Sequence, residues 1–288
     1  MRAFAYERPT RLADALASLA ERGDDARPLA GGTDLIIRLR DGTVRPSIIV
    51  DVKQIAELDA SIVADGDRLV IGARTTMTDL MADAQIRSSF VALAEAAAVV
   101  GSVQIRNRAT LAGNLCNASP AADTAPALLV YDATVVAEGT GGRRRIPIDS
   151  FFVRSGITTL EPGELVTAIE LPLPRRRNGS VHLRRTRRRG HDLASVTLAC
   201  AIGDDGGTRL AYGSVGPRPV LSVDPSGALA DPTSPAGKRE RVLDGMLATA
   251  APSATSMRAS PEYRHAMLRV LAHRALETAR TRLEADAS

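Results

Sequence analysis

The sequence has few cysteines and few aromatic residues. Cys116 and Cys200 are its two thiols among 288 residues, which excludes a disulfide framework and a four-thiolate zinc or iron–sulfur site within this chain. We therefore expect any iron–sulfur cluster to lie on a partner. There is no Trp, and Phe and Tyr number four each, so the chain offers no aromatic platform for stacking bases.

Long hydrophobic runs are also missing. No stretch approaches 18 consecutive apolar residues, and the first residues, MRAFAYERPTRLADAL, lack the apolar region of a secretory signal. We expect no membrane span and a cytoplasmic location. The net charge of +4 arises from 37 basic and 33 acidic residues. Because the arginine runs at 143–145, 175–177 and 184–189 lack interleaved aromatics, they favour a solvated face or a partner contact over nucleic acid.

The first fifty residues alternate between helix and strand patterns. Apolar positions over 12–20 predict a helix with Thr10 as N-cap and Gly23 as its end. Strand-like segments follow at 27–30 and 47–52, separated by a glycine loop and a short helix. This order predicts a small, mostly parallel α/β unit.

A second α/β unit is expected to follow, ending near Pro172. It contains a Gly/Asn-rich stretch, 101–123. Inside this stretch the small, polar segment TLAGNLCNASPAAD at 110–123 is expected to be a loop wrapped around a ligand. Ser119 and Pro120 resemble the N-cap and first residue of the next helix.

The segment LPLPRRRNGS at 171–180 is the best candidate for a linker. Strand-like runs follow it, two of them joined by the turn DDGG at 204–207, and a last helix opens at Ser260 and Pro261. The expected fold class is α+β, with a domain at 1–174 (subdomains about 1–55 and 56–174) and a second domain at 178–288 that holds a small antiparallel sheet and helices.

The segment Ala30-Gly31-Gly32-Thr33-Asp34-Leu35 is the first candidate site. Two glycines let the backbone approach a ligand, their N–H groups can bind an anion, and the following helix N-terminus favours negative charge. A plain Gly-Gly turn with a Thr cap is an equally good interpretation of this hexapeptide alone. Neither GxGxxG nor GxxxxGK[ST] occurs, which disfavours Rossmann and P-loop binding.

The second candidate site is Thr110-Leu111-Ala112-Gly113-Asn114, followed by Ser119 and Asp123. Its hydroxyl, glycine backbone and amide could bind a pyrophosphate, and Asp123 could accept hydrogen bonds from a ribose. Helix capping is the simpler interpretation of Ser119 and Asp123 when they are taken alone.

Four segments together resemble a known family. They are AGGTDL at 30–35, QIRNRATLAGNLCNASPAADTAPALLVYDA at 104–133, RRRGHDLASV at 187–196 and SPEYRHAMLRVLAHRAL at 260–276. In this order they resemble the FAD-binding medium subunit of the molybdenum hydroxylases, the family of xanthine dehydrogenase and carbon monoxide dehydrogenase flavoproteins. The resemblance implies a two-part, PCMH-type FAD-binding domain and a C-terminal domain of the medium subunit.

The resemblance also implies which residues hold FAD. Both candidate loops would hold its pyrophosphate, and Asp123 would be the acid on the ribose side. Weaker correspondences place Val100 and Val166 near the flavin and Arg184 where relatives often carry Lys. Two departures stand out: Ala112 replaces the first glycine of a Gly-Gly pair, and its methyl could shift the loop. His182 stands where an aromatic residue is common, and it could alter the shielding of the flavin.

Cys116 and the pair His191 and Asp192 also allow a chemical role. Cys116 could carry a covalent flavin, but a small residue in a ligand loop is the simpler interpretation, so we expect non-covalent FAD. His191 and Asp192 could form a dyad, but neighbours on a strand point to opposite faces, which favours a structural role.

The resemblance implies an electron-transfer subunit. Molybdopterin and two [2Fe–2S] clusters would lie only on partners, a large and a small subunit, in a dimer of heterotrimers. FAD would deliver electrons to NAD, oxygen or another acceptor. The alternatives are a stand-alone flavin-dependent alcohol oxidase of the related fold and a flavin-free assembly subunit. A substrate-binding domain with its own acid or base would distinguish the oxidase, and the residues after the linker offer none that we identify.

Overall fold

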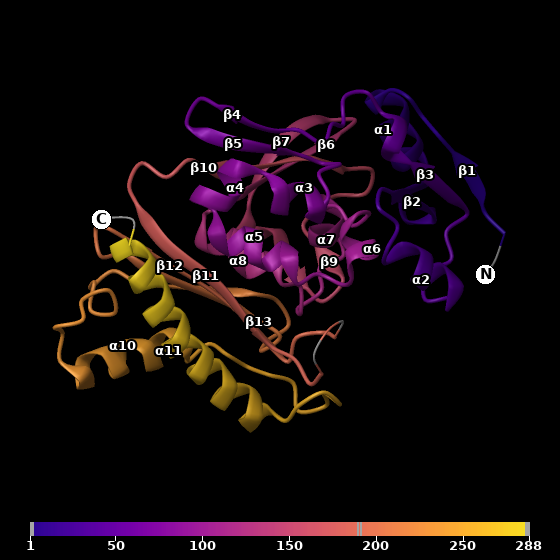
Figure 1. Cartoon of the computed structure of the whole chain (residues 1–288). Helices are drawn as coiled ribbons and strands as arrows, with labels where there is room; N and C mark the ends of the chain where they lie inside the picture. The colour runs from indigo at the N-terminus through magenta and orange to yellow at the C-terminus, as the bar shows by residue number, and fades with distance from the viewer. Residues whose placement is uncertain (1–2, 189, 191, 286–288) are drawn as a thin grey trace.

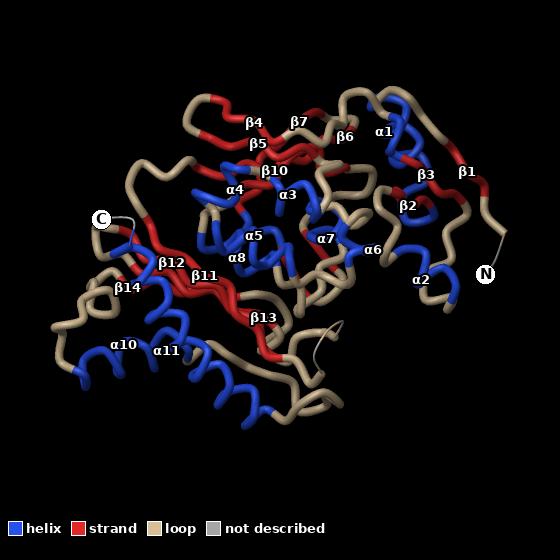
Figure 2. The backbone as a smooth tube through the Cα atoms, in the orientation of Figure 1, coloured by secondary structure: helices blue, strands red, loops and turns tan. Residues whose placement is uncertain are grey.

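The computed structural model describes residues 3–188, 190 and 192–285, and within these residues it contains four β-sheets. A small N-terminal lobe, indigo in Figure 1, lies at one end of the molecule. The C-terminal part forms a sheet crossed by a long yellow helix. Figure 2 shows the helices of the middle segment lying between the two larger sheets. No helix of the described part is long and apolar enough to span a membrane.

The N-terminal lobe is built on a three-stranded sheet with the order β1-β3-β2, parallel throughout as expected. Its strands are β1 (Ala5–Glu7), β2 (Ala26–Leu29) and β3 (Ile48–Asp51). The helices of the lobe are α1 (Leu12–Arg22), the 3-10 turn η1 (Gly23–Asp25), α2 (Leu35–Arg40) and the 3-10 turn η2 (Val52–Gln54).

The sequence predicted the C-terminal end of α1 correctly and its N-terminal end incorrectly. Gly23 takes a φ of 49° and ends the helix, as expected from its freedom to adopt positive φ. The expectation of Thr10 as N-cap is wrong, because Arg11 occupies that position without a side-chain bond. The carbonyl of Thr10 instead accepts the N–H of Ala56 at 3.2 Å.

The second sheet has five antiparallel strands in the order β4-β5-β10-β6-β7. Its strands are β4 (Ile62–Asp65), β5 (Arg68–Gly72), β6 (Thr134–Gly139), β7 (Gly142–Pro147) and β10 (Leu165–Pro172). A separate hairpin consists of β8 (Phe152–Arg154) and β9 (Ile157–Thr158). The expected second unit is therefore present, and its sheet is antiparallel.

Seven short helices accompany this sheet in the described residues. They are α3 (Met77–Ala82), α4 (Ala84–Ser89), α5 (Val91–Ala98), α6 (Val103–Arg106), α7 (Leu111–Cys116), α8 (Thr124–Val130) and α9 (Ile148–Phe151). Two expectations are corrected here. The segment 110–123 is not a plain loop, since it contains α7. The helix expected to open at Ser119 begins at Thr124, because the Ser119 hydroxyl accepts the N–H of Ala121 in a turn.

The third sheet is antiparallel with the order β11-β12-β13-β14. Its strands are β11 (Asn178–Arg185), β12 (Val196–Gly203), β13 (Thr208–Gly213) and β14 (Val220–Asp224). The helices that follow are α10 (Ala236–Leu247) and α11 (Pro261–Ala285). The hairpin at 204–207 and the helix start at Pro261 are as expected.

Strand β12 lies in the interior of the third sheet and is buried on both faces. It therefore contributes side chains to both hydrophobic cores of the chain. Ala199 and Ala201 belong to the main hydrophobic core with α5 and α8, whereas Leu198 and Cys200 belong to a second core with α11. Because side chains alternate along a strand, one apolar run serves both cores. The small residues on one face let helices of the middle segment pack closely against the sheet.

Candidate functional site

The two candidate loops, far apart in the sequence, meet in the structure. A Cβ added at Gly31 would lie 2.0 Å from the carbonyl oxygen of Arg108, two residues before Thr110. Glycine is therefore required for this close approach. The contact brings the loop after β2 against the segment that leads into α7, so both loops border one region.

The first loop presents backbone donors that the chain does not use. The N–H groups of Gly32, Thr33 and Asp34 donate to no acceptor among the described residues. Gly32 has a φ of 76°, a left-handed conformation that turns the backbone into α2. Consecutive free N–H groups of this kind form an anion-binding concavity.

The second loop is the start of α7. The hydroxyl of Thr110 accepts the N–H of Gly113 at 3.0 Å and so caps this helix. Gly113 is exposed, and a Cβ there would lie 2.8 Å from the same hydroxyl. A side chain at position 113 would therefore disturb the cap and cover the open face.

Ala112 lies on the other side of α7. It is 6% exposed and belongs to the main core, together with Leu111, which is fully buried. The methyl of Ala112 is therefore accommodated by hydrophobic packing, away from the exposed Gly113.

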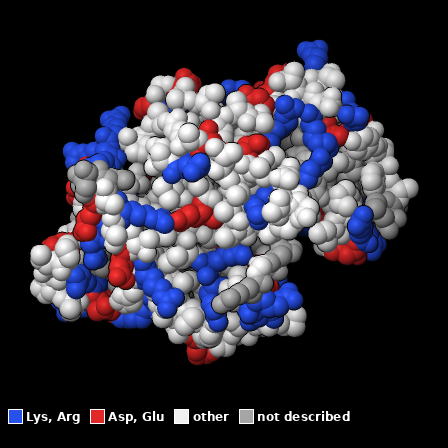
Figure 3. Space-filling view, in the orientation of Figure 1, with Lys and Arg blue, Asp and Glu red and all other residues white. Residues whose placement is uncertain are grey.

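Hydrogen bonds connect α7 to α8 and to α2. Asn114 Oδ1 accepts the hydroxyl of Thr124 at 2.6 Å, which joins α7 to the first residue of α8. The C-cap residue Asn117 accepts Arg38 Nη1 at 3.4 Å, which joins α7 to α2. The second contact places a guanidinium beside the first loop. In Figure 3 a recess separates the N-terminal lobe from the rest of the visible face, and Lys and Arg side chains border it.

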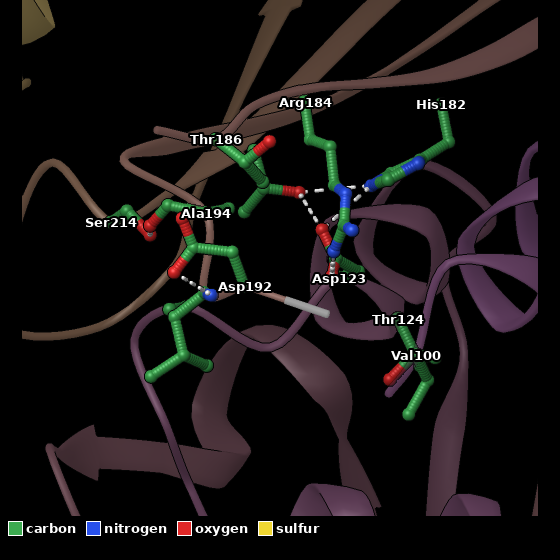
Figure 4. Close-up of polar contacts among 12 residues, drawn as sticks. Val100, Asp123, Thr124, His182, Arg184, Thr186, Asp192, Ala194 and Ser214 are labelled. Atoms are coloured by element: carbon green, nitrogen blue, oxygen red, sulfur yellow. Dashed lines mark hydrogen bonds and ion pairs between the residues drawn. The ribbon is translucent and has the colours of Figure 1, made fainter. Parts of the chain in front are cut away.

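Asp123 lies in a cluster of buried polar side chains and not at an open surface. Its Oδ2 accepts Arg184 Nη1 at 2.9 Å, and its Oδ1 accepts the hydroxyl of Thr197 at 3.0 Å. The ring Nε2 of His182 lies 2.9 Å from that hydroxyl and 3.4 Å from Asp123 Oδ1. Figure 4 shows Arg184 and His182 converging on Asp123 from the strand above it. The carboxylate predicted to face a ribose is thus engaged by Arg184 and Thr197.

The remaining predicted residues are placed as follows. Ala30 and Leu35 are half-buried at the two ends of the first loop, and Ser119 is half-buried in the turn before α8. Val100 is half-buried and packs against the main core; its side chain is drawn in Figure 4. Val166 is 6% exposed on β10 and packs in the main core, so little of its side chain is accessible.

The surroundings of Cys116 and Asp192 favour structural roles for both residues. Cys116 lies at the end of α7, and desolvation by the surrounding protein raises the pKa of its thiol, which disfavours the nucleophilic thiolate. Asp192 Oδ2 accepts the backbone N–H groups of Arg187 at 3.2 Å and Arg188 at 3.1 Å. His191, the other member of the suggested dyad, lies outside the described residues.

Sequence reasoning missed four residues of this region: Arg38, Asn117, Thr124 and Thr197. A signal existed for Arg38, since it stands one helical turn after the glycine loop in LIIRLR. The others carry no local signal, because their roles depend on partners in other elements.

These features define an α+β protein in which two glycine loops, distant in the sequence, meet and present backbone N–H groups without an acceptor among the described residues. The family described as the FAD binding domain in molybdopterin dehydrogenase matches residues 2–174. The family described as the CO dehydrogenase flavoprotein C-terminal domain matches residues 182–279. The chain belongs to this family of FAD-binding subunits of molybdenum hydroxylases, as the resemblance implied.

Individual relatives agree with this assignment. The chain is 33% identical over 279 residues to the xanthine dehydrogenase FAD-binding subunit of Escherichia coli O157:H7, covering 95% of each. It is 30% identical over 280 residues to the carbon monoxide dehydrogenase medium chain of Hydrogenophaga pseudoflava, covering 96% of each. Among solved structures, reconstituted CO dehydrogenase from Oligotropha carboxidovorans superposes with a TM-score of 0.90 at 29% identity, covering 98% of this chain and 99% of that one.

The residues of the region fit FAD. The N–H groups of Gly32, Thr33 and Asp34, which have no acceptor among the described residues, and the Asn114 amide suit a pyrophosphate, which takes hydrogen bonds from neutral donors. The exposed Gly113, which has no side chain, leaves room for a ligand to approach the start of α7. Arg38 adds positive charge at the same place. The donor set therefore agrees with the family.

Proposed function

We propose that this chain passes electrons from [2Fe–2S] clusters of a partner subunit through non-covalent FAD to NAD, oxygen or another acceptor. The observation that carries the proposal is the meeting of the two glycine loops, one of which has three N–H groups without an acceptor in the described part of the chain. The chain also matches flavoprotein subunits over nearly its whole length. When bound, FAD supplies the redox chemistry, and the protein supplies binding and orientation.

Each loop has a distinct part in this proposal. Residues 30–35 and the segment 110–114 bind the pyrophosphate, with the exposed Gly113 giving backbone access. Asp123 orients Arg184 and the turn that contains Ser119 rather than serving mainly as a ribose acceptor. Val100 provides apolar surface near the flavin, and Val166 supports it from within the core.

The proposed partner subunits are inferred from the names of the relatives. The matching chains include medium chains of carbon monoxide dehydrogenases, and a name of this kind implies larger and smaller companions. We propose a large molybdopterin subunit and a small [2Fe–2S] subunit, assembled as a dimer of heterotrimers in the cytoplasm. The organic or inorganic substrate would then be chosen by the large subunit.

We also propose the division into domains at 1–174 and 178–288, with subdomains at about 1–55 and 56–174. Strand β10 ends at Pro172 and β11 begins at Asn178 in a different sheet, which supports a boundary between them. The first matched family ends at residue 174 and the second begins at residue 182.

The test is the visible absorption spectrum of the purified chain, followed by acid release of the chromophore. Non-covalent FAD at about one per chain supports the proposal. A colourless protein that takes up no added FAD contradicts it and favours the assembly subunit. An isolated chain that reduces its flavin with an alcohol, without partners, contradicts it in favour of the oxidase.

Copurification tests the electron route separately. The tagged chain is expressed with its candidate partners, and molybdenum and iron are measured in the purified complex. Flavin reduction by substrate should require both partners. Reduction that persists after the [2Fe–2S] subunit is omitted would contradict the proposed route.

A further inference from the structure

Ser214, just after β13, has an unusual backbone. Its φ of 64° lies in the left-handed region, and it is 8% exposed. Its N–H donates to the Pro120 carbonyl at 2.6 Å, and its hydroxyl donates to the Ala194 carbonyl at 2.9 Å. A strained conformation in a non-glycine residue persists where its surroundings fix it, as these two bonds do.

Arg264 of α11 binds the backbone carbonyl of Ser214, which is the third polar group of that residue. Its Nη1 donates to the carbonyl oxygens of Ser214 and Ser195, the latter at 2.9 Å, and its Nη2 donates to the hydroxyl of Ser256 at 2.6 Å. Arg264 is 5% exposed, and no carboxylate pairs with it among the described residues. A buried guanidinium that binds neutral carbonyls is costly, because its charge is desolvated without a counter-charge.

The contacts of Ser214 and Arg264 lead to the proposed FAD site. Pro120 belongs to the turn between α7 and α8 that carries Ser119 and Asp123. A Cβ added at Gly213 would lie 2.7 Å from the Pro120 carbonyl oxygen, so the end of β13 presses directly on this turn. Ala194 and Ser195 precede Thr197, whose hydroxyl binds Asp123. Figure 4 shows Ser214 beside Ala194.

We propose that Arg264 and Ser214 are positioning residues for FAD binding. Arg264 acts from the C-terminal helix α11 and Ser214 from the residue after β13. Together they fix the Pro120 turn and the residues Ala194 and Ser195 just before β12, and so they set the geometry of Asp123 and Ser119. This inference rests on the proposed FAD site. It assigns a role in cofactor binding to a helix that lies in a different domain from the two glycine loops.

The experiment uses the full chain, stripped of FAD and titrated with FAD while flavin fluorescence is followed. The variants are Ser214→Ala, Arg264→Met and Arg264→Lys. Arg269→Met is the matched control, because Arg269 lies on the same helix but pairs with Glu240 and Asp244 of α10. Visible circular dichroism of bound FAD and the melting temperature are measured for each variant.

We expect Ser214→Ala and Arg264→Met to raise the Kd for FAD about tenfold, roughly the effect of losing one buried hydrogen bond. The visible dichroism of their bound FAD should change. Arg264→Lys should recover part of the affinity lost in Arg264→Met, since an ammonium can still donate to carbonyls. Arg269→Met should leave both the Kd and the dichroism unchanged.

Two outcomes would overturn the inference in different ways. If the wild-type chain binds no FAD, the proposed function fails and the inference fails with it. If the wild type binds FAD but Ser214→Ala matches it in Kd and dichroism, the inference alone fails. Should Arg264→Met not fold, Ser214→Ala and Arg264→Lys decide the question, because a merely structural role lowers the melting temperature without changing the dichroism of bound flavin.

Discussion

Arg184 of β11 and Asp123 at the N-terminus of α8 form an ion pair whose Nη1 and Oδ2 atoms lie 2.9 Å apart. The two side chains are 16% and 7% exposed, so the pair is largely shielded from water. It joins residues 61 positions apart in the sequence. The third sheet is thereby tied to the turn proposed to contact FAD.

Replacing Arg184 by Gln should weaken both stability and FAD binding. The change leaves the Asp123 carboxylate buried without its guanidinium, which costs about 3 kcal/mol of unfolding free energy. We expect the Kd for FAD to rise about tenfold. Urea unfolding and fluorescence titration measure the two effects. In the control Arg209→Gln, the partner Asp132 is 63% exposed, so the loss should stay below about 1 kcal/mol. Equal losses of stability and of FAD affinity in Arg184→Gln and Arg209→Gln would contradict a special contribution of the buried ion pair between Arg184 and Asp123.

Gly31→Ala should separate the two glycine loops. The new Cβ would meet the Arg108 carbonyl oxygen at 2.0 Å, and backbone must move to relieve this overlap. We expect a loss of about 2 kcal/mol in stability and a rise of at least about tenfold in the Kd for FAD. Gly245→Ala in α10 is the control, because no atom lies within 4 Å of its added Cβ. It should raise stability by about 0.5 kcal/mol without altering FAD binding. Unchanged FAD affinity in Gly31→Ala would contradict the paired-loop site.

Thr110→Val should remove the cap of α7 while keeping the shape of the side chain. Loss of the bond to Gly113 N–H costs about 1 kcal/mol of stability and frees the helix start to move. Because Gly113 belongs to the proposed pyrophosphate site, FAD should dissociate faster. Asp83→Ala is a matched control, since it removes the cap of α4, a 2.8 Å bond to Ile86 N–H, at a similar cost. A dissociation rate changed equally by both variants would count against a specific role for Thr110.

The ion pair of Glu164 with Arg144 should make stability depend on pH. Two hydrogen bonds of 2.7 Å join the guanidinium to both carboxylate oxygens, and they hold the pKa of Glu164 below its usual range. A lowered pKa means that the stabilisation is fully present above the unfolded-state pKa, about 4.3. It is lost as pH falls through the folded-state pKa.

Glu164→Gln tests this dependence. At pH 7 the variant should be less stable than the wild type by about 1 kcal/mol, a modest value because Arg144 is 40% exposed. The difference should shrink as the pH falls below about 4. Urea unfolding at pH 7 and pH 3.5 measures it, with Glu138→Gln as control for an ion pair whose Arg143 is 62% exposed. A difference that is the same at both pH values would contradict the assignment.

The structure also shows where local sequence patterns mislead. Ser119 followed by Pro120 has the composition of a helix start, yet α8 begins at Thr124. The Pro120 carbonyl is held by Ser214, 94 positions further along the chain (214 minus 120), so a distant contact is part of what shapes this turn. The pattern of Gly113 and Asn114 indicated a loop, and packing of Leu111 and Ala112 in the core made it a helix.

The sequence by itself determined the features that depend on neighbouring residues. The apolar periodicity of α1 and its end at Gly23, the 204–207 hairpin, the two glycine loops and the family resemblance follow from local composition and conformational freedom. Only the tertiary structure decided that Gly31 lies against Arg108, that Asp123 is engaged by Arg184, and that Ser214 and Arg264 support the same turn. These contacts depend on how strands and helices pack across long stretches of chain, and no local periodicity specifies which distant residue will fill a given place.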